Sequence, residues 1–173
     1  MKKIIGYSLM TIFMLFSMSS EAQWFSKKKS KKNTKQWKYE IKCIGEGNQG
    51  TYSLKVYSYT KKPTKSYVHD EAKRNAVHGI IFKGISAGKC RNKPALARNP
   101  NLENEKKEFF DSFFADGGKY TKFVTVSSGI EPGDVTKISR KEFKVGLNVA
   151  VNVDLLRKDL EAAGIIQGLG SRF

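Results

Sequence analysis

The amino-acid sequence predicts an α+β fold: a two-layer sandwich with an antiparallel sheet of about four strands, helices on one face, and the element order ββααββα. Two observations carry this prediction. Apolar side chains occupy every second position from Phe143 to Val153, which is typical of a strand with one buried face. Apolar side chains recur every third or fourth position from about Ser66 to Lys83, which is typical of an amphipathic helix. Apolar helix faces bury themselves against a sheet, so two layers follow.

The first two strands are predicted around a glycine-rich turn. Apolar and polar residues alternate from Trp37 to Cys43 and again from Tyr52 to Val56. The intervening Gly45, Gly47 and Gly50 match the dinucleotide-binding fingerprint as a string of letters, but that fingerprint needs a helix opening at its last glycine. A strand pattern follows here, so a β-hairpin turn is the preferred interpretation.

Two helices are predicted next, separated by a long loop. The first covers about Ser66–Lys83 and ends at Gly84, and the loop Gly84–Asn99 is rich in Gly, Pro and basic residues. A second helix is predicted from Asn99-Pro100, where Asn suits the cap and Pro the first turn. Its apolar face holds Leu102, Phe109, Phe110, Phe113 and Phe114. This spacing predicts a core helix, with a docking face for an apolar partner as the alternative.

The remaining elements complete the predicted order. Tyr120–Ser127 is β-branched and aromatic and is expected to be a strand, followed by a turn at residues 131–134. After the long alternating strand, Asp154 is expected to cap a last helix from Leu155 to Ala163.

The N-terminus predicts export. Lys2 and Lys3 precede an apolar run of 15 residues, Ile4 to Met18, and small residues then lead to a cleavage site after Ala22. A bilayer-spanning helix needs roughly 20 apolar residues, so residues 1–22 are interpreted as a cleavable signal peptide, with a membrane anchor as the alternative. The expected location is the periplasm or the cell surface, with no transmembrane helix left after cleavage.

Residues 23–36 are expected to be a disordered basic tether in front of a single domain, residues 37–173. Seven lysines and no acidic residue lie between positions 27 and 38, within a chain of net charge +16. The tether lysines considered for binding are Lys27, Lys28, Lys29, Lys31 and Lys32. Together with Trp24 and Phe25 they suit adsorption to anionic lipid or another polyanion, and a plain solvated linker is the alternative.

The two cysteines, Cys43 and Cys90, predict one disulfide, because both remain in the exported part of the chain. Closing this loop would stabilise the fold by roughly 4 kcal/mol in the chain-entropy model. Two buried free thiols are the alternative. A disulfide would pin the long loop to the first strand and pre-place a set of cations for an anionic ligand. These are Lys89, Arg91, Lys93 and Arg98. An ordinary basic surface loop is the other interpretation.

No catalytic or cofactor motif emerges, and neither a cofactor nor a metal is expected. His69 and His78 lie about half a turn apart around one helix and do not face a common metal ion. Cys90 lacks a nucleophile signature around it. Export and the absence of a recognisable RNA-binding or DNA-binding motif argue against nucleic acid. The expected function is a non-enzymatic binding or assembly module of the envelope. Its expected partners are anionic lipid, an envelope polymer or an envelope protein. The alternative is an enzyme acting on an envelope polymer.

Four segments carry a resemblance to known proteins: Val77–Gly84, Ala97–Leu102, Phe114–Tyr120 and Leu156–Ile165. In these segments the chain resembles uncharacterised exported proteins of Bacteroides-type bacteria. The resemblance extends over nearly all of the predicted domain. It implies a periplasmic or surface setting, and it implies no activity and no site residues.

Overall fold

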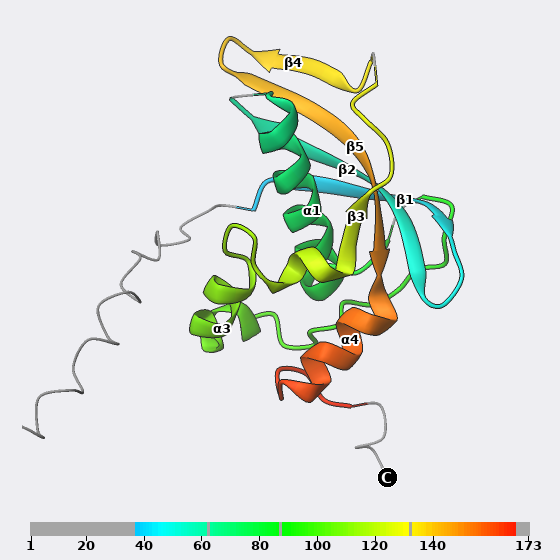
Figure 1. Cartoon of the computed structure of the whole chain (residues 1–173), viewed down its shortest axis with the longest axis vertical. Coiled ribbons are helices and arrows are strands. Elements are labelled where there is room, and N and C mark those ends of the chain that lie inside the picture. Colours follow the sequence, from blue (N-terminus) through cyan, green and yellow to red (C-terminus); the bar gives the residue numbers. More distant parts are fainter. Residues whose placement is uncertain (1–36, 62, 87, 132, 169–173) are drawn as a thin grey trace, which may run out of the picture. The chain divides into compact units, whose positions relative to one another are not determined.

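The computed structural model describes residues 37–61, 63–86, 88–131 and 133–168, and their elements belong to one compact unit (Figure 1). The predicted signal peptide, residues 1–22, and the predicted tether, residues 23–36, lie outside the described residues. Within the described ranges, no helix has the length and apolar character needed to cross a membrane.

An open antiparallel sheet of five strands forms one layer of the fold. The strands are β1 (Tyr39–Glu46), β2 (Thr51–Thr60), β3 (Val124–Val126), β4 (Val135–Ser139) and β5 (Glu142–Asn152). The order is β1-β2-β5-β3, and β4 also pairs with β5. Since β2 pairs with β5 along its length, β3 and β4 share the other edge of β5 at successive positions. The α+β prediction with an antiparallel sheet is confirmed, with one strand more than expected.

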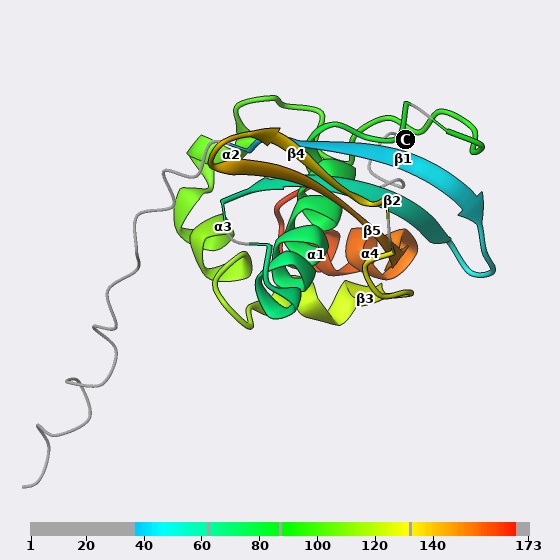
Figure 2. The same cartoon turned by 90° about the horizontal axis from the view of Figure 1, so that it is seen from above.

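The helices lie on one side of this sheet (Figure 2). They are α1 (Lys65–Phe82), α2 (Leu102–Glu105), α3 (Lys107–Phe113), the 3-10 helix η1 (Lys119–Phe123) and α4 (Val153–Ala162). Along α1, residues at helical spacing are fully buried against β2 and β5, as predicted. A Cβ atom at Gly79 would lie 1.9 Å from Cδ1 of Ile41, so the glycine allows α1 to cross β1 closely.

The core lies between the two layers. Its sheet side comes from the inward positions of β2 and β5, and its helix side from α1, α3, η1 and α4. The larger fully buried side chains are Leu54, Val56, Ile81, Phe114, Tyr120, Leu147, Val149, Leu156 and Leu160. Phe110 and Phe113 are buried as well, so the aromatic stripe belongs to the core as predicted.

Two elements differ from the sequence-based expectation because tertiary contacts override local pattern. The helix expected from Asn99 is broken at Lys106, whose φ of −111° and ψ of 36° separate α2 from α3. The strand expected over Tyr120–Ser127 is shortened to Val124–Val126, because its first half is the 3-10 helix η1. This turn buries Tyr120 against Phe114, with ring centroids 6.0 Å apart.

Two further corrections concern β4 and the last helix. β4 was not predicted, because each of its five residues is exposed and no alternating apolar pattern marks it. The cap of α4 is Asn152 rather than Asp154: the Asn152 side chain accepts a hydrogen bond from the Leu155 N–H at 2.9 Å. Helix α4 therefore begins at Val153, two residues earlier than predicted, which places Asp154 in its first turn.

Candidate functional site

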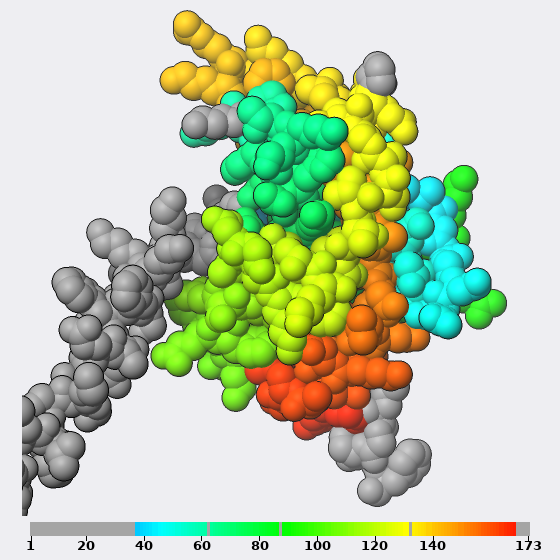
Figure 3. Space-filling view, viewed as in Figure 1, coloured from blue at the N-terminus to red at the C-terminus, as the bar shows by residue number. Residues whose placement is uncertain are grey.

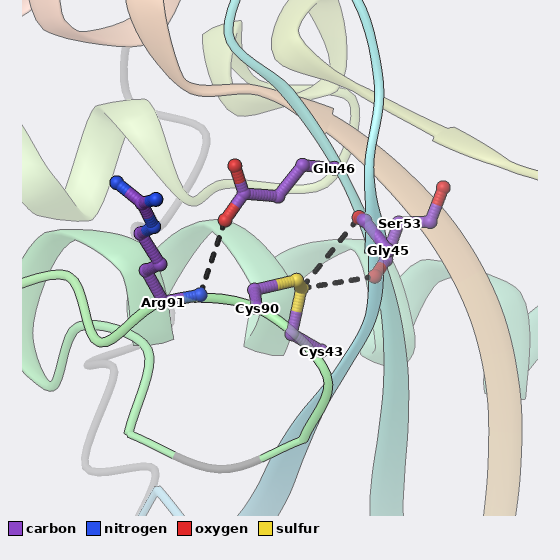
Figure 4. Close-up of a disulfide and its surroundings, with 6 residues drawn as sticks. All are labelled: Cys43, Gly45, Glu46, Ser53, Cys90 and Arg91. Carbon is purple, nitrogen blue, oxygen red and sulfur yellow. Dashed lines mark hydrogen bonds between the residues drawn. A yellow bond between two sulfur atoms is a disulfide. The ribbon is translucent and has the colours of Figure 1, made fainter.

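A disulfide joins Cys43, in the middle of β1, to Cys90 in the long loop (Figure 4). The two Cα atoms are 5.7 Å apart across a sequence separation of 47 residues, and the predicted pairing is confirmed. The Cys43 side chain is only 3% exposed, whereas Cys90 is half-buried. The Cys43 sulfur lies 3.5 Å from the Ser53 carbonyl oxygen and 3.6 Å from that of Gly45. The bond therefore anchors the loop directly to the sheet.

Backbone contacts extend this anchor along the outer edge of β1. The Lys89 N–H donates to the Cys43 carbonyl oxygen at 2.9 Å, and the Arg91 N–H donates to the Glu46 carboxylate at 3.1 Å (Figure 4). Gly88 has a φ of 109°, and a Cβ atom there would lie 2.1 Å from the Cys43 carbonyl oxygen. Glycine is thus required for this close approach. The loop satisfies part of the edge strand, which would otherwise present unpaired backbone groups.

The rest of the loop is fixed at its two ends. Ile85 and Lys93 exchange two backbone hydrogen bonds of 2.8 Å. Leu96 and Ala97 are buried, and their N–H groups donate to carbonyl oxygens at the C-terminal end of α1, those of Ile80 and Ile81. The path of the described loop residues, 84–86 and 88–99, is therefore set by the disulfide, by a short antiparallel bridge and by the end of α1.

The four predicted anion-binding residues, Lys89, Arg91, Lys93 and Arg98, are all exposed on this loop. Residues 84–99 contain these four basic side chains and no acidic one. Among the described residues, no ion pair involves any of the four. Lys89 and Arg91 flank the disulfide, Lys93 lies in the bridge to Ile85, and Arg98 follows the buried Leu96 and Ala97. The loop thus presents four exposed cations from three anchored points, with the Glu46 carboxylate held on the Arg91 backbone N–H.

The sheet face away from the helices offers a contrast, because several of its lysines are paired. Lys144 lies 2.8 Å from the Glu40 carboxylate and 4.6 Å from the centre of the Tyr57 ring. Hydrogen bonds from Lys144 and from the Tyr59 hydroxyl lower the pKa of Glu40. Further ion pairs join Lys38 to Glu142 and Lys55 to Asp134. Apart from Lys42, which is exposed and lies 5.6 Å from the centre of the Tyr57 ring, the lysines named here are engaged by carboxylates.

A buried polar cluster at the start of β1 was not predicted. The Tyr39 hydroxyl lies 2.5 Å from Nδ1 of His78, and Nε2 of His78 lies 3.2 Å from Oε2 of Glu103. The indole N–H of Trp37 donates to Oε1 of Glu103 at 2.8 Å. A histidine inside the nearly continuous apolar run Val77–Ile81 was the sequence signal for burial, but its partners on β1 and α2 are far away in sequence.

The protonation states of this cluster follow from burial and hydrogen bonding. Burial, followed by the nearby Glu103 charge, raises the pKa of Tyr39, so its hydroxyl stays protonated and donates to Nδ1 of His78. Burial also lowers the pKa of His78, against the opposing effect of Glu103. For Glu103, burial raises the pKa, but hydrogen bonds from His78 and Trp37 bring the net pKa below its ordinary value. A neutral imidazole between a phenol donor and a carboxylate acceptor results.

The chemistry open to these groups is limited by access. His78 is 3% exposed and Tyr39 7% exposed, so the buried cluster of Tyr39, His78 and Glu103 serves to connect β1, α1 and α2 inside the fold. The Cys90 sulfur is bonded to Cys43 and is not a thiolate nucleophile in this state. His69 lies in the second turn of α1, half-buried. The described residues contain no group of three or more His, Cys, Asp and Glu side chains that could hold a metal ion.

Comparison with protein-family models, with curated proteins and with solved structures gives no match. The resemblance to exported proteins of Bacteroides-type bacteria stays a prediction.

Proposed function

We propose that this protein is a non-enzymatic binding module of the cell envelope, located in the periplasm or at the cell surface, that engages an anionic envelope polymer. The disulfide-anchored loop, residues 84–99, is the proposed binding element. The observation that carries the proposal is the fixed loop path with four exposed cations that form no ion pair within the described residues.

The anchoring matters because it reduces the cost of binding. A free basic loop loses conformational entropy when it settles on a ligand, whereas this loop is already held by the disulfide and by backbone hydrogen bonds at Cys43, Ile85 and the end of α1. Lysine and arginine side chains need only limited further ordering to contact phosphate, sulfate or carboxylate groups. A repeating anionic chain would satisfy several of them at once.

The proposed location rests on the disulfide together with the N-terminal sequence. Disulfides persist in oxidising compartments and are rare in the cytosol. The lysine-flanked apolar run at residues 4–18 is typical of a signal for export into such a compartment. The two features are independent, and both favour an extracytoplasmic protein.

A binding role is favoured over catalysis by the positions of the reactive side chains. The buried imidazole of His78 is enclosed by Trp37, Phe82 and Phe114, whose ring centres lie 3.7, 4.7 and 5.7 Å from the imidazole centre. The exposed charged groups of the loop are all cations, which bind anions but supply neither a nucleophile nor a base at neutral pH.

The test measures binding of the purified protein to a soluble polyanion, dextran sulfate. Lys89, Arg91, Lys93 and Arg98 are changed together to Gln. The matched control changes four other exposed lysines to Gln, namely Lys65, Lys106, Lys122 and Lys158, so net charge falls equally. We expect the loop variant to bind at least about tenfold more weakly than the control, because each lost cation near an anionic surface contributes around 1 kcal/mol. Equal weakening in both variants would contradict the proposal.

A further inference from the structure

In the hairpin formed by β4 and β5, strand β4 is left uncovered: no other element among the described residues packs over its side chains. All residues from Val135 to Lys141 are exposed. Figure 3 shows side chains of this yellow and orange segment extending from the upper end of the domain. Core-forming strands bury one face, so a strand exposed at every residue contributes little to the core.

Apolar and cationic side chains coincide on this strand and its turn. Val135 is 43% exposed and Ile138 is 49% exposed, although Val135 lies opposite the fully buried Val145 of β5. Lys137, Arg140 and Lys141 form no ion pair within the described residues. Single exposed apolar side chains are common on protein surfaces. Two of them within four residues, together with one cation between them and two after them, are a less ordinary combination.

The acidic residues around the hairpin are largely neutralised. Asp134 pairs with Lys55 at 2.5 Å, and Glu142 pairs with Lys38 at 2.9 Å. Glu131 is exposed at the base of the hairpin. Beyond the turn, Lys61 is exposed directly after β2, whose last residue, Thr60, lies opposite Phe143. The excess of unpaired charge at this end of the sheet is positive.

The first described residues of the chain lie at the same end of the sheet. Lys38, directly before β1, has its ammonium group 2.9 Å from the carboxylate of Glu142, the first residue of β5. The register agrees with this contact: Tyr39, at the start of β1, lies opposite Ser58, and Phe143, near the start of β5, lies opposite Thr60. The ion pair thus brings Lys38 to the end of the sheet at which the β4–β5 turn lies.

We propose that the β4–β5 hairpin is a membrane-docking surface for an anionic lipid bilayer. Lys137, Arg140 and Lys141 contact the headgroups, and Val135 and Ile138 enter the interface between headgroups and acyl chains. Cys43 pairs with Leu54 of β2, and Leu54 pairs with Val149 of β5. Val149 lies seven residues along β5 from Glu142 at the hairpin turn, or roughly 23 Å. Docking through the hairpin therefore leaves the loop 84–99 accessible, and this surface is separate from the proposed polymer site.

A bilayer fits this surface better than a protein strand does. The outer edge of β4 has no strand partner among the described residues, which by itself would also suit addition of a strand from another protein. However, β4 has an irregularity in its register between Lys137 and Ser139, and it carries an edge lysine. Bulges and edge lysines are features that oppose strand addition.

The experiment measures partitioning of the purified protein onto vesicles of phosphatidylcholine with and without phosphatidylglycerol. One variant changes Lys137, Arg140 and Lys141 to Gln, and its matched control changes Lys106, Lys122 and Lys158 to Gln. A second pair compares Ile138→Ser with Leu155→Ser, because Leu155 is 48% exposed but lies on α4. All four variants alter exposed side chains without ion pairs, so their thermal unfolding should match the unaltered protein.

We expect the hairpin charge variant to partition at least about tenfold more weakly onto phosphatidylglycerol vesicles than its control. Ile138→Ser should weaken partitioning about threefold or more, and Leu155→Ser should not. The loop variant of Lys89, Arg91, Lys93 and Arg98 should still bind vesicles, and the hairpin variant should still bind dextran sulfate. Equal losses in variant and control would overturn the proposal. So would a hairpin variant that loses dextran sulfate and vesicles alike while Ile138→Ser changes neither, because the hairpin would then be a general polyanion site.

Discussion

The imidazole ring of His78 stacks on the indole ring of Trp37, with centroids 3.7 Å apart and planes inclined by 23°. Trp37 and Tyr39 lie at the start of the folded chain, and His78 lies on α1. The two hydrogen bonds of the imidazole extend the contact to β1 and α2. One neutral histidine therefore links three elements that are distant in sequence.

This link predicts a stability that depends on pH. Burial lowers the folded-state pKa of His78 below 6.5, so the unfolded chain binds a proton more readily than the folded one. The stabilisation is fully present above pH 6.5 and is lost as pH falls from 6.5 through the lower folded-state pKa. Glu103, whose pKa is also lowered, adds a further loss at more acidic pH. Lys83, which lies over the Tyr39 ring, also opposes His78 protonation.

Urea unfolding between pH 7.5 and 5.5 measures this effect. His78→Gln should flatten the dependence of the free energy of unfolding on pH, at the cost of lower stability at neutral pH. The comparison variant is His69→Gln, whose histidine is only half-buried and should account for a smaller part of the slope. If His78→Gln left the slope of the free energy of unfolding against pH unchanged, the proposed contribution of the neutral His78 to stability would be contradicted.

Removal of the disulfide should destabilise the protein and open the loop. The double change of Cys43 and Cys90 to Ala should lower the free energy of unfolding by roughly 4 kcal/mol in the chain-entropy model. Trypsin should then cleave faster after Lys89 and Arg91. Their backbone N–H groups bond to Cys43 and Glu46 of β1 on either side of the disulfide, so these contacts should loosen when the disulfide is removed. Peptide mapping during limited proteolysis gives the readout. Unchanged cleavage rates at these two positions would show that backbone contacts alone hold the loop.

Gly79→Ala should destabilise the protein even though Ala has the higher helix propensity. The added Cβ would lie 1.9 Å from Cδ1 of Ile41, so α1 and β1 must move apart or Ile41 must leave its rotamer. Overpacking of this kind costs roughly 1–3 kcal/mol, against a propensity gain of about 1 kcal/mol. The double variant Gly79→Ala with Ile41→Val should recover part of the loss in thermal unfolding. A more stable single variant would contradict the close crossing.

Deletion of residues 24–36 should leave the fold intact and weaken binding to anionic vesicles. The deleted segment holds six lysines, Trp24 and Phe25, and it lies before Trp37, where the described part of the chain begins. We expect unchanged thermal unfolding and a weaker dependence of vesicle binding on salt, because electrostatic adsorption is screened over about 8 Å at physiological ionic strength. Binding that is the same with and without the segment, at low and at high salt, would assign it a linker role.

Local patterns predicted the parts of the fold in which one face meets the core. The alternation from Phe143 to Val153 and the helical spacing of Val68, Ala72 and Ala76 needed no knowledge of distant residues. Tyr120 behaves differently, because its burial against Phe114 depends on how η1 packs. β4 had no signal at all, since an uncovered strand needs no apolar alternation.

The candidate site shows the same division. The disulfide followed from the count of two cysteines, and the exposed loop cations followed from composition. The contacts of Gly88 and Lys89 with Cys43 could not be predicted from the sequence, because they depend on how closely the loop approaches the edge of β1. The partners of His78 were equally out of reach, since 39 residues separate it from Tyr39 and 25 from Glu103.

The salt dependence of dextran sulfate binding shows whether the disulfide-anchored loop is the binding element. The unaltered protein, the Gln variant at Lys89, Arg91, Lys93 and Arg98, and the Gln control at Lys65, Lys106, Lys122 and Lys158 are titrated over a series of salt concentrations. If the anchored loop is the binding element, the loop variant binds more weakly and shows a shallower fall of affinity with salt, while the control stays close to the unaltered protein. Identical affinities and slopes in the two variants would mean that net charge alone governs binding, and would contradict the account.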